Sequence, residues 1–298
     1  MPRVGILGST RNETNLDLVD RWRFLGLDSL VVSPRDAPAR FYRDDVVIGR
    51  LDVRASLDGV EPGLRELTVL SRLGVRLVNR PGPIMNAHDK LRTARLLAAS
   101  GLPHPRTTHV RSGELPTLSP PVVVKPRFGS WGIDVFRCHT WEEIRQTLTA
   151  VSNRPWFSRR GAIVQELLPP VGYDIRVLVA GGTVVGAEER VAAPGEWRTN
   201  ISLGGSHRPT APSPAAASLA VAAVAALGGD FFGVDLMPVR SGYAVLEVNG
   251  AVDFDANYSL WNGDVFADAA GALGIRPESI ADAAEGRVAV GVPPPACG

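Results

Sequence analysis

Residues 232–249, FGVDLMPVRSGYAVLEVN, give the clearest strand–turn–strand signal in the chain. Two apolar runs, Phe232–Val239 and Tyr243–Asn249, flank the turn residues Arg240-Ser241-Gly242. Runs of this length on either side of a short glycine-containing turn are typical of a β-hairpin. Both strands also carry polar, oxygen-bearing side chains within the otherwise apolar pattern.

The register of this hairpin determines which polar residues meet. A three-residue loop pairs Val239 with Tyr243, so counting back places Asp235 opposite Glu247. Asn249 lies two residues beyond Glu247 and therefore on the same face. Opposed carboxylates repel unless a cation lies between them, and hard oxygen ligands suit Mg²⁺. The alternative is that these are solvated polar residues on an exposed face.

A second candidate site follows the expected strand Pro121–Pro126, which ends with Lys125 next to a glycine loop. Gly129, Ser130 and Gly132 belong to that loop. Glycines let backbone N–H groups approach phosphate oxygens, and the lysine adds a positive charge. The spacing is not that of a Walker motif, and an ordinary strand end is the alternative.

The segment Gln165-Glu166-Leu167-Leu168 ends an expected strand just before two prolines. A backbone segment that ends in this way could bind an adenine ring, with its apolar side chains against the ring. A plain strand exit is the alternative.

A further hairpin is expected around Gly181-Gly182, a strong two-residue turn signal. Its strands are Asp174–Ala180 and Thr183–Arg190, and Arg198-Thr199-Asn200 follows. Arginines on and beyond this hairpin are suited to bidentate binding of phosphate or carboxylate. Ordinary surface salt bridges are the alternative.

The first ~85 residues alternate short apolar strands with helical segments, which predicts a parallel sheet. Gly5-Ile6-Leu7-Gly8 lacks the third glycine of a dinucleotide fingerprint. Strands are expected at 4–7, 30–32, 46–48, 76–78, 135–137 and 162–167. Helices are expected at 16–25, 64–73, 89–100, 141–151 and 215–227.

The composition is that of a globular protein: the chain has 298 residues, a net charge of +1 and 45% hydrophobic residues. No Lys/Arg run indicates nucleic-acid binding, and no apolar stretch is long enough to span a membrane. Cys138 and Cys297 lack the spacing of metal ligands. We expect a cytoplasmic enzyme.

The order of these motifs resembles the ATP-grasp superfamily, and within it the RimK-type glutamate ligases and the related LysX-type ligases. The resemblance runs from about residue 1 to 275. It rests on Asp89-Lys90, Lys125-Pro126 with the glycine loop, Gln165–Leu168, Asp174-Ile175-Arg176, Glu189-Arg190, Arg198-Thr199-Asn200, Gly233-Val234-Asp235 and Glu247-Val248-Asn249.

The resemblance implies an α/β fold of the ATP-grasp type in three parts. These are an N-terminal parallel α/β domain over residues 1–86, a central lid subdomain over 87–168 and a C-terminal domain with a mixed β-sheet over 169–276. ATP is expected between the last two parts. Residues 277–298 are expected to form a tail.

Carried over by position, the resemblance also implies residue roles. The ATP site is expected to comprise Lys90, Lys125, Gly129, Ser130, Gly132, Gln165, Glu166, Leu167, Leu168, Asp174 and Arg176. Asp174 is expected to meet the ribose, and Glu166 and Leu168 the adenine. Arg190, Arg198 and Asn200 are the expected catalytic residues. Asp235, Glu247 and Asn249 are expected to hold a pair of Mg²⁺ ions, or Mn²⁺.

The implied reaction converts a substrate carboxylate to an acyl phosphate, which an amine then attacks. The expected partners are a small-molecule or peptide carboxylate and an amine or amino acid, with no nucleic acid and no membrane. A homo-oligomer is a possible assembly. The alternatives are an ATP-grasp small-molecule kinase and a non-catalytic nucleotide-binding regulatory protein.

The sequence departs from the familiar ligases after Asn249, where the short Pro- or Thr-containing stretch is missing. Asp253 and Asp255 stand there instead and are candidates for holding a substrate ammonium, or for capping a solvated loop. Ser9, Arg11 and Asn12 follow the first strand and are expected to face the substrate cleft, because ligands favour the carboxyl ends of parallel strands.

Overall fold

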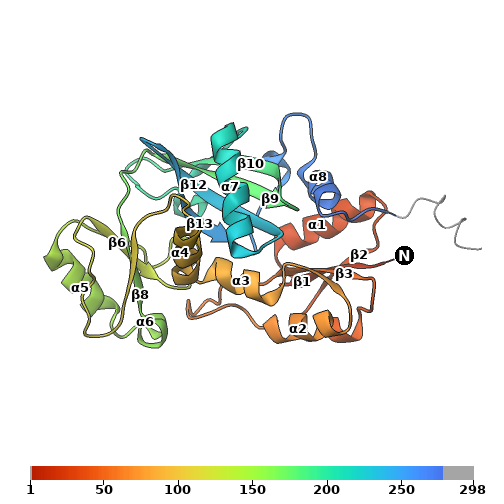
Figure 1. The fold of residues 1–298 in the computed structure, drawn as a ribbon, viewed down its shortest axis with the longest axis horizontal. Coiled ribbons are helices and arrows are strands. Elements are labelled where there is room, and N and C mark those ends of the chain that lie inside the picture. The colour runs from red at the N-terminus through yellow and green to blue at the C-terminus, as the bar shows by residue number, and fades with distance from the viewer. Residues whose placement is uncertain (1, 278–298) are drawn as a thin grey trace, which may run out of the picture.

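The computed structural model describes residues 2–277 and arranges them as three β-sheets joined and covered by helices (Figure 1). The predicted tail lies outside the described residues, apart from residue 277. The N-terminal sheet is parallel, as predicted, with the strand order β2-β1-β3-β4. Its elements are β1 (Val4–Gly8), α1 (Glu13–Phe24), β2 (Ser29–Val32), η1 (Ala37–Ala39), β3 (Val46–Arg50), α2 (Leu64–Arg72) and β4 (Arg76–Val78).

Two consecutive helices, α3 (Pro81–His88) and α4 (Lys90–Ala99), follow this sheet. Helix α3 is not among the helices predicted from the sequence, because the run Pro81-Gly82-Pro83 is typical of a turn. Proline is nevertheless well suited to the first helical position, where its missing N–H has no helical partner to lose. Asp89 separates the helices and caps α4, accepting hydrogen bonds from the Leu91 and Arg92 backbone N–H groups.

The middle sheet is antiparallel and has the strand order β5-β8-β6-β7. Apolar side chains from its buried face form one cluster with helices α5 and α6, including Val124, Ile144 and Trp156. Its elements are β5 (Thr107–Val110), β6 (Val122–Pro126), β7 (Phe136–Cys138), α5 (Trp141–Val151), α6 (Pro155–Arg160) and β8 (Ala162–Glu166).

The C-terminal sheet has the strand order β11-β10-β9-β12-β13, and every one of its pairings is antiparallel. The predicted mixed sheet is therefore wrong. Tight hairpins join β9 to β10 and β12 to β13, and such hairpins can connect only antiparallel strands. The elements are β9 (Tyr173–Ala180), β10 (Thr183–Val191), η2 (Ile201–Leu203), β11 (Ser206–Pro209), α7 (Pro214–Leu227), β12 (Phe231–Val239), β13 (Gly242–Asn249), η3 (Ala256–Tyr258) and α8 (Val265–Ala272).

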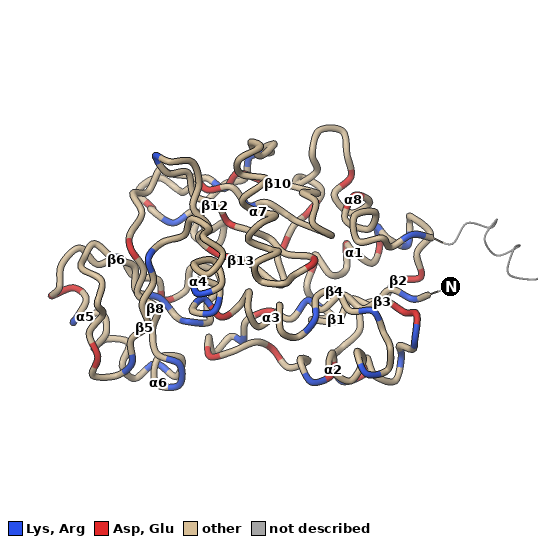
Figure 2. Tube along the Cα trace, viewed as in Figure 1, with Lys and Arg blue, Asp and Glu red and all other residues tan. Residues whose placement is uncertain are grey.

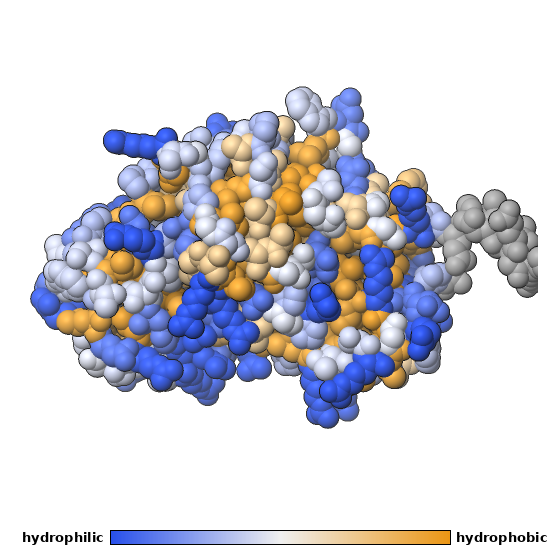
Figure 3. All heavy atoms as spheres, viewed as in Figure 1, coloured by the Kyte–Doolittle hydropathy of each residue, from blue (hydrophilic) through white to orange (hydrophobic). Residues whose placement is uncertain are grey.

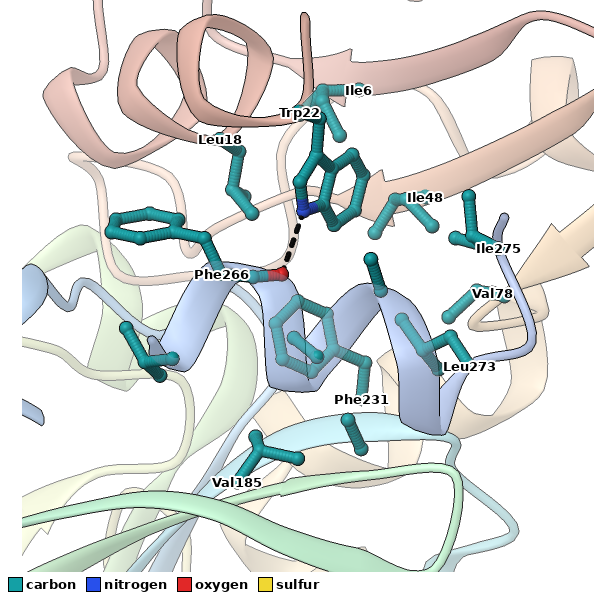
Figure 4. Packing of buried hydrophobic residues seen from close by; sticks show 14 of the residues in the cluster. Ile6, Leu18, Trp22, Ile48, Val78, Val185, Phe231, Phe266, Leu273 and Ile275 are labelled. Carbon is teal, nitrogen blue, oxygen red and sulfur yellow. Dashed lines mark hydrogen bonds between the residues drawn. The ribbon is translucent and has the colours of Figure 1, made fainter. Parts of the chain in front are cut away.

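Alternate residues of the C-terminal sheet enter two different cores. Val177 and Val179 pack against α7, whereas Leu178 and Ala180 pack in a cluster with α1 and α8. Figure 4 shows this second cluster, in which Trp22 donates a hydrogen bond from Nε1 to the Phe266 carbonyl at 2.9 Å. The N-terminal and C-terminal sheets thus share a core through α8, and the boundaries at residues 86 and 168 stay a prediction.

The hairpin between β12 and β13 has the predicted register but not the predicted loop. The loop has two residues, because Val239 pairs with Gly242 rather than with Tyr243. A bulge then adds one residue, Leu246, to the second strand and restores the pairing of Asp235 with Glu247. The bulge also directs Leu246 to a cavity wall.

Charged residues of both signs are interspersed along the chain (Figure 2). Apolar surface gathers over the Ala-rich helix α7 in the centre of Figure 3. Within residues 2–277, no helix combines the length and apolar character needed to cross a bilayer.

Candidate functional site

A cavity of about 170 Å³ lies between the middle and C-terminal sheets, and every residue predicted to bind ATP or metal or to act in catalysis lines it. The residues come from α4, β6 and its following loop, the end of β8 and the residues after it, strands β9, β10, β12 and β13, and the segment after β10. Segments that lie far apart in the sequence therefore meet at one cavity. Their individual roles stay predictions.

The centre of the cavity holds a buried network of carboxylates and guanidinium groups. Asp235 accepts two hydrogen bonds from Arg176, at 2.7 and 2.9 Å, and its Oδ2 lies 2.8 Å from Arg190. Burial opposes ionisation, but Arg176 and Arg190 hold the pKa of Asp235 well below its usual range. Asp235 is therefore charged across the physiological pH range.

Asp174 fixes the position of Arg190 from the neighbouring strand. Its two oxygens accept hydrogen bonds from Arg190, at 2.8 and 2.6 Å, and Oδ2 also accepts one from Thr199 at 2.6 Å. The predicted ribose contact of Asp174 stays a prediction, and the structure gives this carboxylate a clear positioning function. An Asp–Arg pair of this bidentate geometry restricts the guanidinium to one orientation.

Two lysines extend the positive charge toward the glycine loop. Lys90 donates to Glu247 Oε1 and to the Gly129 carbonyl, each at 2.6 Å. Burial and the neighbouring Lys90 lower the pKa of Lys125 to about 8. A phosphate group placed between these ammonium groups would offset both effects, because an opposite charge favours the protonated form.

The glycine loop contacts the segment that follows β10. Arg198 donates to the Gly132 carbonyl at 3.1 Å, and Ser202 donates to the Trp131 carbonyl at 3.0 Å. Gly132 has a φ of +71°, and a Cβ there would lie 2.8 Å from the Asn200 amide oxygen. Only glycine allows this approach without displacing Asn200.

The predicted adenine segment borders the same cavity at the end of β8. Gln165 donates to the Thr107 hydroxyl at 2.9 Å, and the Glu166 carboxylate accepts from Arg106 at 3.1 Å. Leu167, Leu168 and Met237 add apolar surface. A flat aromatic ring is suited to such a wall.

The donor set at the hairpin fits Mg²⁺. Asp235 and Glu247 face each other, and Asn249 lies on the same strand face as Glu247. The Asn249 amide nitrogen is buried and lacks a hydrogen-bond partner in the described part of the chain, so nothing there restrains the amide from turning its oxygen to a ligand. Carboxylate and amide oxygens are ligands that Mg²⁺ prefers. The set has only two carboxylates, and residues 2–277 contain no cluster of three or more His, Cys, Asp or Glu that could hold a metal ion.

A second cavity of about 280 Å³ adjoins the first. Arg176, Arg190, Asn200 and Asn249 line both, together with Ser130 and Trp131 of the glycine loop. Asp253 and Asp255 line the second cavity, and their binding of a substrate ammonium stays a prediction.

The end of the first strand contributes to the second cavity differently from the prediction. Ser9 and Arg11 are absent from the wall, which instead contains Glu13 and Thr14 of α1. Asn12 acts indirectly, by donating to Asp253 at 2.8 Å. The helix begins directly after Asn12, so its first turn occupies the space expected for the loop.

Several cavity residues are not among the predicted site residues. His88 lies on α3, which was not predicted, and Trp131 lies at the tip of the glycine loop. Leu246 enters through the bulge, and Tyr258 through a short 3₁₀ turn. Each position depends on contacts between distant segments.

Comparison with known proteins identifies the family of the chain. Residues 87–262 match the RimK-like ATP-grasp domain family. The chain is 33% identical over 235 residues to the probable alpha-L-glutamate ligase of Sodalis glossinidius (strain morsitans), covering 76% of this chain and 77% of that protein. It is 30% identical over 253 residues to the tetrahydromethanopterin:alpha-L-glutamate ligase of Methanosarcina acetivorans, covering 73% and 76%. The crystal structure of D-alanine–D-alanine ligase from Bacillus anthracis complexed with ATP superposes with a TM-score of 0.65 at 16% identity, covering 95% of each chain.

The fold and its cavity define an ATP-grasp ligase, as the sequence predicts. Within that class, the chain belongs to the RimK-like ATP-grasp family of carboxylate–amine ligases.

Proposed function

We propose that the chain uses ATP and Mg²⁺ to join a carboxylate to an amine through an acyl phosphate. The observation that carries this proposal is the shared wall of the two cavities, formed by Arg176, Arg190, Asn200 and Asn249. A phosphoryl group transferred from a nucleotide in one cavity to a substrate in the other moves along the residues that line both cavities. The relatives' names, which describe glutamate ligases, and the ATP-bound neighbour support the same reaction class.

In this proposal ATP occupies the first cavity. Its adenine lies against residues 165–168, and its phosphates lie between Lys90, Lys125 and the glycine loop. Asp235, Glu247 and Asn249 would hold Mg²⁺, which would supply positive charge to neutralise the phosphates. Lys90, which pairs with Glu247 in the structure, then turns to the phosphates.

The substrate carboxylate lies at the shared wall and attacks the γ-phosphorus of ATP. The bond from that phosphorus to the β,γ-bridging oxygen breaks, which leaves ADP and an acyl phosphate. Arg190 and Arg198 stabilise the charge on the transferred group, and Arg190 needs no reorganisation because Asp174 already orients it. The amine then attacks the acyl carbon, phosphate leaves, and the amine gives up a proton to the solvent. Positioning and charge neutralisation account for the catalysis, without a side-chain nucleophile.

The test is ATP turnover with a panel of carboxylates, with hydroxylamine as a small nucleophile that converts an acyl phosphate into a hydroxamate. We expect carboxylate-dependent phosphate release together with a hydroxamate or an amide of the expected mass. Phosphorylated product without any hydroxamate would show a kinase instead. Nucleotide binding without turnover on any carboxylate would show a regulatory protein.

Glu247→Gln provides the matched test of the metal site. We expect this variant to lose Mg²⁺-dependent turnover while it keeps part of its nucleotide affinity. Glu142→Gln, at an exposed position on α5, is the control and should behave as wild type. Normal turnover in Glu247→Gln would disprove the metal assignment.

A further inference from the structure

The second cavity has an acidic wall, formed by residues that do not line the first cavity. Five carboxylates line it: Glu13 and Asp17 on α1, Asp52 after β3, and Asp253 and Asp255 after β13. These residues come from three separate parts of the chain. The tertiary fold, rather than a single loop, brings them together.

The cationic residues near this wall leave much of its charge unbalanced. Arg176 and Arg190 also line this cavity, but Asp235 and Asp174 already neutralise them. Arg50 lies 3.8 Å from Asp253. It is almost fully buried, and hydrogen bonds to Asn15 and the Val252 carbonyl hold it behind the wall.

Asp52 reflects this excess of negative charge. Burial, with a smaller contribution from the nearby carboxylates of Asp253 and Glu61, raises the pKa of Asp52 to about 6. Its Oδ1 accepts a hydrogen bond from the adjacent Val53 N–H. A cationic ligand would relieve the repulsion between Asp52 and Asp253.

His88 provides an independent sign of a ligand in the same cavity. Its side chain is about 95% buried, with a relative exposure of 5%, and it lines the cavity. Its Nε2 has no hydrogen-bond partner among residues 2–277. Burial and the neighbouring Lys90 lower the pKa of His88 to about 4, so the ring is neutral. The ring donates a hydrogen bond to the Leu51 backbone, which uses the one N–H of the neutral ring. The other ring nitrogen, Nε2, can therefore accept a hydrogen bond from a ligand N–H.

We propose that the amine substrate carries a second cationic group, as in a diamine or a basic amino acid, which binds between Asp52 and Asp253. His88 accepts a hydrogen bond from the reacting amine, close to the wall shared with ATP. This inference rests on the proposed ligase function and adds the chemical class of the amine. Glutamate as the amine would place its side-chain carboxylate against like charges, so the chain is inferred to differ in this respect from relatives named as glutamate ligases.

The experiment measures binding of 1,4-diaminobutane, 1-aminobutane and glutamate to the full chain with Mg²⁺ and a non-hydrolysable ATP analogue, by calorimetry. A charge-assisted hydrogen bond to a carboxylate predicts at least about tenfold tighter binding of the diamine than of the monoamine. Asp52→Asn and Asp253→Asn should each remove most of that preference. Asp20→Asn, at an exposed position on α1, is the control and should retain it.

Two further variants keep the inference open to refutation if a buried substitution fails to fold. Glu13→Gln changes an exposed side chain of the same wall and should reduce diamine binding in a folded protein. His88→Leu should weaken the diamine and the monoamine equally, because it removes a contact to the reacting amine that both share. Glutamate binding more tightly than the diamine, equal binding of both amines, or unchanged binding in the acidic variants would each overturn the inference.

Turnover separates this inference from the proposed function. An amide formed from the diamine supports both. Hydroxamate formation together with weak diamine binding overturns the inference and leaves the ligase function standing. Absence of hydroxamate with every carboxylate overturns the ligase function, and the binding preference then decides the cation site alone.

Discussion

Asp235→Asn is expected to destabilise the folded protein far more than Glu247→Gln, although the two carboxylates face each other across one hairpin. The Asp235 side chain is 6% exposed and neutralises two guanidinium groups. An asparagine there leaves those two charges facing each other. Its amide N–H groups also meet donors where the carboxylate offered acceptors.

The magnitude follows from burial and from the remaining partners. Removing one partner of a buried ion pair costs about 3–5 kcal/mol. Arg190 keeps Asp174, so we expect a cost near the lower end, about 3 kcal/mol. The Glu247 side chain is 27% exposed and its pair with Lys90 is partly solvated, so its loss should cost about 1 kcal/mol or less. The expected difference is about 2 kcal/mol.

The assay is urea unfolding of wild type and both variants at pH 7 with EDTA, which removes any contribution from bound metal. Because the folded pKa of Asp235 is depressed, its contribution is complete above the unfolded pKa of about 3.9 and is lost as pH falls through the folded value. The gap between wild type and Asp235→Asn should therefore stay constant from about pH 8 to pH 5 and shrink below about pH 4. Equal losses in the two variants, or a gap that grows in acid, would refute this account of the network.

Three further predictions concern Lys125 and Gly132, which line the first cavity, and Asp89, which caps α4. Because the pKa of Lys125 is about 8, ATP binding should take up protons near that pH and weaken above it. Calorimetry in buffers of different ionisation enthalpy measures this proton uptake. Lys125→Met should abolish it. Gly132→Ala should lower kcat/KM by at least about tenfold, whereas Gly113→Ala, with φ +81° and no atom near its Cβ, should cost only about 1 kcal/mol of stability and leave kcat/KM unchanged. Asp89→Asn should lower the free energy of unfolding by about 2 kcal/mol in urea, because the carboxylate accepts two hydrogen bonds from Arg127, and an unchanged midpoint would contradict this.

Local patterns in the sequence were sufficient for the elements that short-range rules control. Gly181-Gly182 predicted a two-residue turn, and both glycines adopt positive φ there. Alternating strands and helices predicted the parallel N-terminal sheet. Such features follow from backbone sterics and from hydrophobic period, which neighbouring residues determine.

The loop of the hairpin between β12 and β13 was not predictable from local turn rules. The sequence predicted that Asp235 faces Glu247 but assumed a three-residue loop, whereas the structure has a shorter loop and a bulge at Leu246. Two compensating local errors gave the same pairing. Packing on both faces of the sheet selects the register, because a slip by one residue would turn the apolar side chains outward.

The motifs and their order in the sequence alone specified the family, the residue types of the nucleotide cavity and the class of reaction. The tertiary structure supplied what depends on distant segments meeting: Arg176 and Arg190 on one carboxylate, His88 from an unpredicted helix, and an acidic wall assembled from three parts of the chain. Charge–charge energies depend on distance and burial, and a linear sequence records neither.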